Sequence, residues 1–360
     1  MKSNTEAFCG NPWTSRHANP EHLLLQWHIT DKCNLRCQHC YQEDYREQGV
    51  GFAQLLGILD QYEMLLAALS EQGRRVSGHI NITGGEPFVR GDFLQLLKEI
   101  RNRRIPFAIL SNGLLIDRAT ARFLKGLSPS FIQVSLEGSQ ARHDAIRGKG
   151  NYEQVLNCLR ILHGVGIRTL VSFTAHQQNF REFPLVAEVC QRYGVSRLWS
   201  DRLIPAGAAN RSDNESLSPE ETKEFFAIMS AQATKRAGRR KRGGIAMHRA
   251  LQFLLSGGKP YRCNAGHGLI TVLPDGTVLP CRRLPISAGN IFETSLCRIY
   301  RESKIFRMLR DPTRVCAGCE ACEFEDSCRG GLRCLAYADT GDPFRADPGC
   351  WRAVSRIESQ

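Results

Sequence analysis

The chain alternates short apolar segments with longer amphipathic ones from residue 22 to about residue 205, and this alternation limits its fold more than any other feature. The apolar segments that read as strands are 22–30, 79–83, 107–111, 131–137, 168–175 and 197–204. Helical periodicity lies between them, for example at 52–72, 93–103, 152–163 and 184–193. Because strands that alternate with helices are typical of parallel β/α units, we predict an α/β fold. Six such units indicate an open, partial (β/α)6 barrel of the TIM type.

Polar side chains follow the predicted strands at or just after the point where each strand ends. They are the cysteine loop after residue 30, Thr83 to Pro87, Ser111 to Gly113, Ser135, Thr174 and Arg202. In β/α barrels the loops at the carboxyl ends of the strands build the active site. Because six separate segments place polar groups at this one end, we predict the active site at the mouth of the barrel.

The cysteine content indicates metal ligation in a reducing compartment. The 360 residues include 15 cysteines, and the polar N-terminus lacks the basic-then-apolar pattern of a secretory signal. The sequence shows no apolar run near the roughly 20 residues that a membrane span needs. We therefore expect a cytoplasmic protein without a membrane partner. Cytosolic cysteines at short fixed spacings are more often metal ligands or catalytic groups than disulfides.

The positive charge is a weak indication of a nucleic-acid partner. The formal net charge is +12, and part of the excess lies in the basic run 235–242. Such runs are usually solvated faces or loops, and thiolate-bound iron-sulfur clusters would lower the net charge. The sequence shows neither interleaved aromatic residues nor a recognisable RNA module. We do not expect nucleic acid as a partner, and an RNA-modifying enzyme stays a remote alternative.

Cys33, Cys37 and Cys40 lie on one loop immediately after the first predicted strand. Three thiolates leave one coordination position open, which in zinc chemistry separates catalytic sites from closed structural ones, and the same logic holds for an iron cluster. Their spacing differs from both ferredoxin patterns. The alternative on spacing alone is a zinc loop completed by His28 or His39.

The run Cys-Asn-Leu-Arg-Cys-Gln-His-Cys-Tyr at 33–41 resembles the signature of the radical S-adenosylmethionine (SAM) superfamily. The resemblance implies that Cys33, Cys37 and Cys40 bind a [4Fe-4S] cluster whose open iron chelates SAM. It further implies reductive cleavage of SAM to a 5′-deoxyadenosyl radical, which abstracts a hydrogen atom from the substrate. A flavodoxin- or ferredoxin-type protein would supply the electron.

The resemblance extends to residues that would contact SAM. Gly84, Gly85 and Glu86 resemble the loop that contacts the amino group of SAM, where glycines allow close backbone approach. Ser135 and Arg147 resemble the pair that holds the carboxylate, a role suited to the donor fork of arginine. The remaining SAM contacts implied in this way are His39, Ser111 and Asn112. For the last two, a role as turn residues is an open alternative.

A second set of cysteines dominates the chain from residue 261 onward, and it resembles the SPASM extension, the auxiliary-cluster domain of radical SAM maturases. The hairpin turn predicted at 274–277 would bring in two of these cysteines from its flanks. The resemblance implies a distal [4Fe-4S] cluster on Cys319, Cys322, Cys328 and Cys350. It implies a proximal cluster of uncertain nuclearity on Cys263, Cys281 and Cys334, with Cys316 or an exogenous group as the fourth ligand.

The C-terminal run departs from relatives in one respect and leaves one alternative open. Relatives usually have a cysteine where this chain has Leu332, and the run 330–350 is closest to the pyrroloquinoline-quinone maturation branch, which can carry cysteines at both positions. Zinc is the alternative, because the Cys316–Cys319 and Cys319–Cys322 spacings each suit a zinc ribbon. The predicted divisions are an N-terminal extension at 1–21, the radical SAM partial barrel at 22–207, a helical connector at 208–258 and a small cysteine-rich SPASM domain at 259–360.

The domain pair implies a maturase that abstracts hydrogen from a ribosomally made peptide or protein and installs a crosslink, an oxidation or an epimerisation. Because 32 residues precede Cys33, too few for a leader-binding winged domain, we expect delivery by a separate peptide-recognition protein or direct recognition of the precursor peptide. Alternatives are a cofactor-biosynthesis enzyme of pyrroloquinoline-quinone or tetrapyrrole type, a sulfatase-maturing oxidase and a cluster-bearing scaffold without catalysis. The sequence does not locate a catalytic base.

Overall fold

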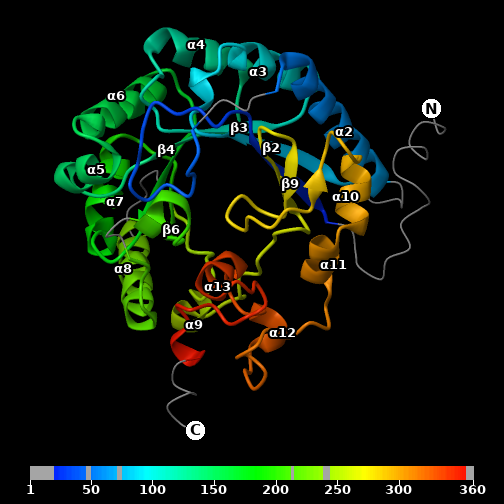
Figure 1. Cartoon of the computed structure of the whole chain (residues 1–360). Coiled ribbons are helices and arrows are strands. Elements are labelled where there is room, and N and C mark those ends of the chain that lie inside the picture. Colours follow the sequence, from blue (N-terminus) through cyan, green and yellow to red (C-terminus); the bar gives the residue numbers. More distant parts are fainter. Residues whose placement is uncertain (1–19, 46–49, 71–74, 212–214, 238–243, 354–360) are drawn as a thin grey trace. The chain divides into compact units, whose positions relative to one another are not determined.

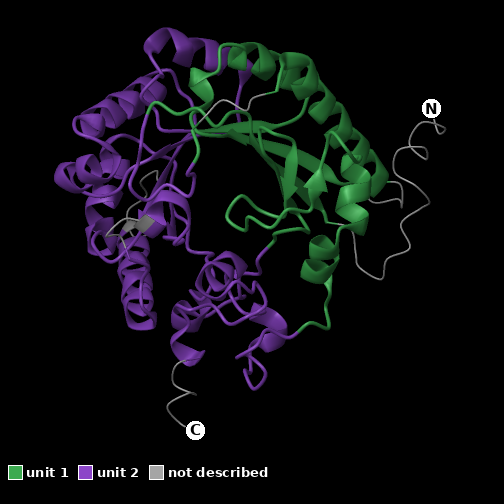
Figure 2. Cartoon of the chain, in the orientation of Figure 1, with its two compact units in different colours: residues 1–34, 44–110, 264–314 green, residues 35–43, 111–263, 315–360 purple. Residues whose placement is uncertain are grey.

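The computed structural model describes residues 20–45, 50–70, 75–211, 215–237 and 244–353 (Figure 1). Most of the predicted N-terminal extension and most of the basic run 235–242 lie outside the described residues. The chain divides into two compact units (Figure 2). The first unit comprises residues 1–34, 44–110 and 264–314, and the second comprises residues 35–43, 111–263 and 315–360. Each unit therefore combines segments that are far apart in the sequence.

The sheet of the first unit is built around its first strand. Its strands are β1 (His22–His28), β2 (Ser77–Thr83), β3 (Phe107–Ser111), β8 (Leu269–Val272), β9 (Thr277–Leu279) and β10 (Gly289–Asn290). β1 pairs in parallel with β2 and β8, whereas β8, β9 and β10 pair antiparallel. Leu23, Leu25 and Trp27 alternate along β1 and are fully buried. The predicted turn at 274–277 joins β8 to β9 as a hairpin.

The helices of the first unit carry apolar residues at helical spacing. They are α2 (Phe52–Ser70), η1 (Pro87–Val89, 3-10), α3 (Phe93–Asn102), α10 (Leu296–Glu302) and α11 (Lys304–Arg310). On α2, Leu55, Leu59 and Tyr62 are buried on one face, and the Tyr62 hydroxyl donates to the Leu23 carbonyl over 2.6 Å. Among the described residues α2 alone is long and apolar enough to cross a membrane, but core helices pass the same test. The contact with β1 is typical of a core helix.

The sheet of the second unit is parallel throughout. Its strands follow the order β4 (Ile132–Ser135), β5 (Thr169–Ala175), β6 (Arg197–Arg202) and β7 (Gly244–Ile245). Its helices are α4 (Arg118–Leu127), α5 (Gln140–Arg147), α6 (Asn151–Gly164), η2 (Phe180–Glu182, 3-10), α7 (Phe183–Arg192), η3 (Gly207–Arg211, 3-10), α8 (Pro219–Ala237), α9 (Phe253–Ser256), α12 (Glu325–Cys328) and α13 (Arg333–Thr340). A strand followed by a helix therefore recurs here as it does in the first unit.

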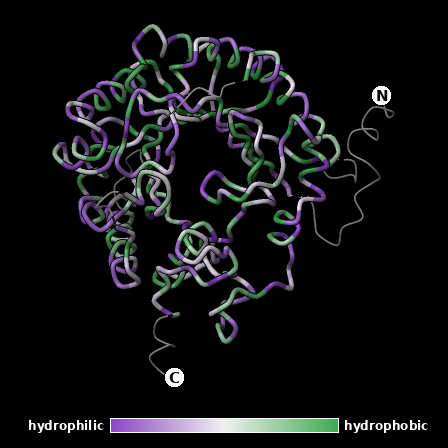
Figure 3. Tube along the Cα trace, viewed as in Figure 1, coloured by the Kyte–Doolittle hydropathy of each residue, from purple (hydrophilic) through white to green (hydrophobic). Residues whose placement is uncertain are grey.

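Aromatic side chains fill the core of the second unit where α7 and α8 pack. The rings of Phe173 on β5 and Phe183 on α7 meet edge-on with centroids 5.6 Å apart. Phe225 on α8 meets Phe183 at 5.7 Å in the same manner. Edge-on pairs at these separations are favourable beyond the area they bury. Figure 3 shows hydrophobic and hydrophilic stretches alternating around the helices, as expected of helices that cover a sheet with one face.

The strand and helix pattern predicted from the sequence is confirmed for all six β/α units, with bounds that mostly differ by one or two residues. The strand predicted at 131–137 ends at Ser135, because Glu137 leaves the sheet to join a network of polar side chains. The segment predicted as a helical connector contains α8 but also β7, which pairs in parallel with β6. A two-residue strand that begins with glycine has no periodicity to reveal it.

Candidate functional site

The loop that carries Cys37 and Cys40 is fixed by backbone contacts within the second unit. The Gln38 amide donates to the Ile146 carbonyl at 3.0 Å, and the Cys40 amide donates to the Cys37 carbonyl at 3.2 Å. A Cβ on Gly207 would lie 2.2 Å from the Tyr41 carbonyl oxygen, so only glycine fits there. The thiols of this loop are partly exposed. The fold therefore holds the backbone tightly while leaving the sulfurs accessible.

The Gly84–Gly85–Glu86 loop packs against the chain that leads into Cys33. The Gly85 amide donates to the Thr30 carbonyl and the Glu86 amide to the Lys32 carbonyl, each at 2.8 Å. A Cβ on Gly85 would lie 2.2 Å from the Lys32 oxygen, and Gly84 has φ +152°. The glycines thus permit close approach of two stretches of backbone. The sequence had indicated close approach to SAM, and the structure shows a second, internal reason for glycine here.

Arg147 stands at the end of a short helix whose two caps fix its position. The Ser139 hydroxyl accepts from the Arg142 amide at the start of α5, and Gly148 ends the helix with φ +110°. The Arg147 guanidinium donates twice to Glu137 Oε1, over 3.0 Å from Nε and 2.6 Å from Nη2. Its Nη1 lies 3.7 Å from the Cys37 sulfur. Arg147 therefore connects a buried carboxylate to a predicted cluster ligand.

Glu137 organises the polar residues around Arg147. Its side chain is 1% exposed, and its Oε2 accepts from the Thr174 amide at 3.0 Å. His39 Nε2 lies 3.4 Å from its Oε1. Burial would raise the pKa of Glu137, but Arg147 and then His39 hold that pKa well below its usual range. The carboxylate is therefore ionised and anchors the Arg147 guanidinium and the His39 ring.

Burial and the nearby guanidinium shift the pKa of the Cys37 thiol in opposite directions. Burial raises the pKa of Cys37, and the guanidinium of Arg147 opposes that rise. Burial would lower the pKa of Arg147, but Glu137 and Cys37 raise it. A permanent cation beside the thiol favours the thiolate, the form that binds iron. The site therefore suits a thiolate-bound cluster.

The other predicted SAM contacts lie at or just after strand ends, and β3 crosses from the first unit into the second at Ser111. The Ser135 hydroxyl lies 3.2 Å from the Ser172 hydroxyl on the adjacent strand. Ser111 Oγ accepts from the Gly113 amide at 2.9 Å, and Asn112 Oδ1 accepts from the Leu114 amide at 3.0 Å. These last two bonds are the turn contacts that the sequence left open as an alternative. A role in SAM binding stays a prediction for both residues.

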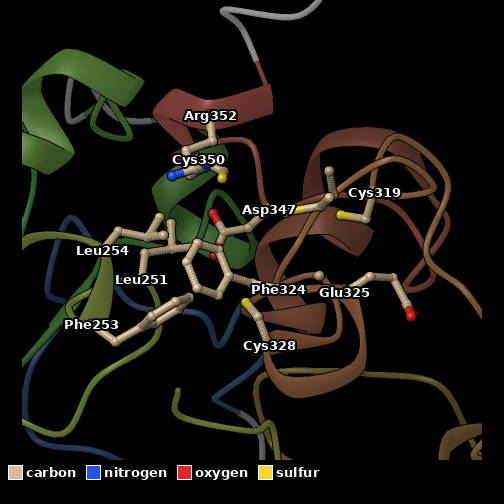
Figure 4. Close-up of a pocket in the computed structure, with 13 residues that line it drawn as sticks. Leu251, Phe253, Leu254, Cys319, Phe324, Glu325, Cys328, Asp347, Cys350 and Arg352 are labelled. Carbon is tan, nitrogen blue, oxygen red and sulfur yellow. The ribbon is translucent and has the colours of Figure 1, made fainter. Parts of the chain in front are cut away.

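The four cysteines predicted to bind the distal cluster line one pocket in the second unit. Figure 4 shows three of them around it, and apolar side chains form the opposite wall. The lining residues that matter here are Cys319, Cys322, Cys328, Cys350, Leu251, Phe253, Leu254 and Phe324. Phe253 and Phe324 meet edge-on with centroids 5.1 Å apart. Thiols that converge on an apolar, recessed site are suited to an iron-sulfur cluster, because the apolar wall limits solvent access.

Burial and neighbouring thiols raise the pKa values of two of these cysteines. Burial, followed by the neighbouring Cys316 and Cys350, raises the pKa of Cys319 to about 12. Burial raises the pKa of Cys328 to about 11, and Cys350 contributes to that rise. Thiols with raised pKa values give up their protons when a cation arrives, so metal binding here releases protons.

A single zinc ion and a four-iron cluster require different spacings of their thiolate ligands. Zinc at 2.3 Å from each sulfur would hold neighbouring thiolates about 4 Å apart. In the described part of the chain, no three His, Cys, Asp or Glu side chains come close enough to hold one metal ion. A four-iron cluster needs wider spacing, because each thiolate binds a different iron. Four thiols that line one pocket match the donor set of a four-iron cluster.

The predicted proximal ligands are divided between the two units. Cys281 lies in the first unit, where its sulfur is 4.0 Å from Gln26 Oε1 on β1. Cys263, Cys316 and Cys334 lie in the second unit. Cys316 is buried beside Arg333, whose Nη1 is 3.7 Å from its sulfur, and it acts electrostatically on Cys319. This places Cys316 near the predicted distal ligands.

Arg202 and Asp347 form a buried pair that the sequence reasoning did not connect. Arg202 Nη1 and Nη2 donate to the two Asp347 oxygens over 2.8 and 2.6 Å, with side-chain exposures of 3% and 0%. Asp347 also accepts from the amides of Leu332 and Gly349, each at 2.9 Å. The Cys350 amide in turn donates to the Asp347 carbonyl. The pair therefore ties the end of β6 to the loops around Cys334 and Cys350.

Comparisons with known proteins agree with this geometry. A model of the radical SAM superfamily matches residues 27–190, and a model of the SPASM iron-sulfur cluster-binding domain matches residues 263–323. Solved structures share the fold over nearly the whole chain. AdoMet-bound anSMEcpe has a TM-score of 0.73 at 18% identity, covering 94% of this chain and 93% of that one. SuiB of Streptococcus suis bound to S-adenosylmethionine has a TM-score of 0.72 at 17% identity, covering 93% of this chain and 78% of that one.

The chain belongs to the radical SAM superfamily. The predicted α/β fold, a partial TIM-like barrel followed by a SPASM domain, is confirmed. The predicted cofactors, SAM and [4Fe-4S] clusters, are those that these two domains imply. The assignment of individual ligands and the domain limits at 1–21, 22–207, 208–258 and 259–360 stay predictions.

Curated relatives of this radical SAM protein span nearly its full length. The AdoMet-dependent heme synthase of Nitratidesulfovibrio vulgaris is 27% identical, covering 94% of this chain and 95% of that protein. The Fe-coproporphyrin III synthase of Methanosarcina barkeri is 26% identical, covering 94% of this chain and 92% of that protein. The mycofactocin maturase MftC of Mycolicibacterium smegmatis is 29% identical, covering 91% of this chain and 82% of that protein. These relatives include both small-molecule synthases and a maturase.

Proposed function

We propose that this radical SAM enzyme acts in cofactor biosynthesis and modifies a tetrapyrrole through hydrogen abstraction. The observation that carries the proposal is similarity to the AdoMet-dependent heme synthase of Nitratidesulfovibrio vulgaris over 94% of this chain and 95% of that protein. The Fe-coproporphyrin III synthase and a pre-heme d1 synthase of Dinoroseobacter shibae show similar coverage of this chain, at 94% and 91%. Because the similarity includes the SPASM region, it supports a shared reaction type as well as a shared fold.

The residues around Cys37 would prepare the site for SAM. With Cys33, Cys37 and Cys40 holding the cluster, bound SAM would supply a 5′-deoxyadenosyl radical that abstracts hydrogen from the substrate. Arg147 would present its fork of donors to the carboxylate of SAM while Glu137 keeps it in place. The Gly84–Glu86 loop would fix the backbone before Cys33 through its two 2.8 Å hydrogen bonds.

The C-terminal cysteines would handle the electron that a substrate radical loses. We assign Cys319, Cys322, Cys328 and Cys350 to a distal cluster on the support of their common pocket. We keep Cys263, Cys281 and Cys334 as proximal ligands, with Cys316 as the candidate for a fourth. A flavodoxin- or ferredoxin-type protein would deliver the electron that starts SAM cleavage. These assignments rest on the predicted ligand sets and on the contacts described above.

Peptide maturation is the second candidate, and one observation favours it. The mycofactocin maturase MftC shares 29% identity over 91% of this chain. The substrate would then be a precursor peptide, with or without a separate recognition protein. A sulfatase-maturing oxidase is a weaker form of this candidate, because Leu332 stands where a cysteine is expected.

An anaerobic assay with two substrates tests the proposal. Reconstituted enzyme is incubated with SAM and dithionite, together with either Fe-coproporphyrin III or a precursor peptide encoded beside its gene. Products are followed by mass spectrometry and 5′-deoxyadenosine by chromatography. The proposal predicts that the tetrapyrrole is modified and that it increases 5′-deoxyadenosine formation. Modification of the peptide alone would replace it with the second candidate.

A further inference from the structure

Arg249 follows the short strand β7, which is an edge strand of the sheet. β7 pairs in parallel with β6, with Leu198 opposite Ile245, and the Ala246 amide continues the ladder to the Leu198 carbonyl at 2.9 Å. The chain then turns, and Arg249 lies over the side chains of β6. The backbone just before Arg249 is therefore held by pairing with β6.

The Arg249 guanidinium lies between two aromatic rings and a carboxylate. Its central carbon is 4.4 Å from the centroid of the Trp199 ring and 5.6 Å from that of Tyr261. Its Nη2 donates to Asp201 Oδ2, and the other Asp201 oxygen accepts from the Arg202 amide at 3.1 Å. The Arg249 and Asp201 side chains are 11% and 8% exposed. Arginine stacked on aromatic faces and anchored by an acid is held rigidly.

The guanidinium retains hydrogen-bonding capacity. Arginine has five N–H donors, and among the described residues the buried Nε of Arg249 has no acceptor. A buried donor without an acceptor is costly, and such groups usually find a partner. Nε itself is shielded from solvent, whereas 11% of the whole side chain is exposed, so a ligand would approach the exposed part of the guanidinium. The partner that matches a planar fork of donors best is a carboxylate.

The register of the sheet places this group near the predicted SAM contact. Ser135 on β4 pairs with Ser172 on β5, and Ser172 pairs with Trp199 on β6. Paired residues share a face of the sheet, and neighbouring strands lie about 4.8 Å apart, so Trp199 is about 10 Å from Ser135. A substrate held at Arg249 would therefore lie within reach of a cofactor bound at Ser135.

We infer that Arg249, stacked on Trp199 and Tyr261 and held by Asp201, binds a carboxylate of the substrate. This inference rests on the proposed function, in which that carboxylate belongs to an acidic side chain of the tetrapyrrole. The Trp199 and Tyr261 rings are partly buried and offer apolar surface beside the guanidinium, which suits a carboxylate attached to a planar, largely apolar molecule.

Binding of a fluorescent porphyrin tests the inference directly. The reconstituted enzyme with SAM is titrated into metal-free coproporphyrin III, and the Kd is read from fluorescence anisotropy. The tetramethyl ester of the same porphyrin has no carboxylate and serves as the second probe. We expect Arg249→Gln to raise the Kd for the acid at least about tenfold, the size of a lost charge-assisted contact, and to leave weak ester binding unchanged. Arg249→Lys keeps the charge but loses the fork, and should fall between the two.

Arg181→Gln is the matched control. Arg181 also donates twice to a carboxylate, that of Glu224, and lies 4.3 Å from the centroid of the Phe180 ring, but its side chain is 61% exposed. It should bind both probes like the wild type. Circular dichroism and iron content of the variants report folding separately from affinity.

Three results would separate the inference from the function it rests on. A Kd for the acid that is the same in wild type, Arg249→Lys and Arg249→Gln would overturn the inference and leave the proposed function standing. Equal binding of acid and ester by the wild type would also overturn the inference. Binding of neither porphyrin by the wild type would overturn the proposed function, and the tetrapyrrole carboxylate with it.

Discussion

Replacing Asp347 by alanine should destabilise the second unit severely. The substitution leaves the Arg202 guanidinium, 3% exposed, without the carboxylate that accepts from both of its terminal nitrogens. It also removes the acceptor of the Leu332 and Gly349 amides. Removing one partner of a buried ion pair typically costs about 3–5 kcal/mol, because the remaining charge is buried and uncompensated.

The size of the effect can be measured as a thermal shift. For a domain of about 200 residues, each kcal/mol lowers the unfolding midpoint by about 2–4 °C, so Asp347→Ala should lower it by about 6–20 °C. Circular dichroism of anaerobically reconstituted protein provides the melting curve. Because the Asp347 carboxylate also accepts from the amide of Gly349, the residue before Cys350, we expect iron loss during purification as a second readout.

Glu302→Ala is the control for this experiment. Glu302 accepts from Arg298 over 2.8 Å, but the two side chains are 64% and 67% exposed. Exposed pairs contribute little, so the midpoint should not change measurably. If Asp347→Ala melts within about 2 °C of Glu302→Ala and keeps its iron, the reasoning that Arg202 and Asp347 hold the cysteine loops is wrong.

Three further predictions follow from the site. Gly85→Ala would place a Cβ 2.2 Å from the Lys32 carbonyl oxygen and should lower the free energy of unfolding by about 1–3 kcal/mol. Gly91→Ala, whose Cβ would have no atom within 4 Å, should be neutral. Equal thermal unfolding midpoints for the two variants would contradict the role of Gly85. Glu137→Gln leaves Arg147 buried without its counter-charge and should slow SAM cleavage at least about tenfold, measured as 5′-deoxyadenosine formed per minute. Glu224→Gln, which removes a carboxylate from an exposed pair, should not slow it. A wild-type rate in Glu137→Gln would show that Arg147 needs no such support. Cys319→Ala together with Cys328→Ala should remove about four irons per chain relative to the wild type, and the buried Cys190→Ala should remove none; unchanged iron in the double variant would refute the distal ligand set.

The sequence was sufficient for the parts of the fold that depend on local pattern. β3 was predicted with the bounds that the structure has, and α2 begins at the predicted Phe52. The two periodicities of strand and helix record which face of each element is buried, and this information is local. The polar residues at strand ends could be predicted for the same reason.

What the sequence could not provide is the pairing of polar residues far apart along the chain. Arg202 and Asp347 are 145 positions apart, and Arg249 reaches Asp201 only because β7 forms. Neither pair leaves a periodic or spacing signal. Glu137 offered one indication, since it lies two residues after Ser135 and would share its face of the strand. The sequence alone does not reveal that Arg147 is its partner.

Formation of 5′-deoxyadenosine is the most direct test of whether this chain cleaves SAM with a cluster held by Cys33, Cys37 and Cys40. Anaerobically reconstituted enzyme is mixed with SAM and dithionite, and the nucleoside is quantified by chromatography. We expect the wild type to form 5′-deoxyadenosine and Cys37→Ala to form none while keeping the irons of the SPASM domain. No 5′-deoxyadenosine from fully reconstituted wild type, or equal amounts from Cys37→Ala, would contradict it.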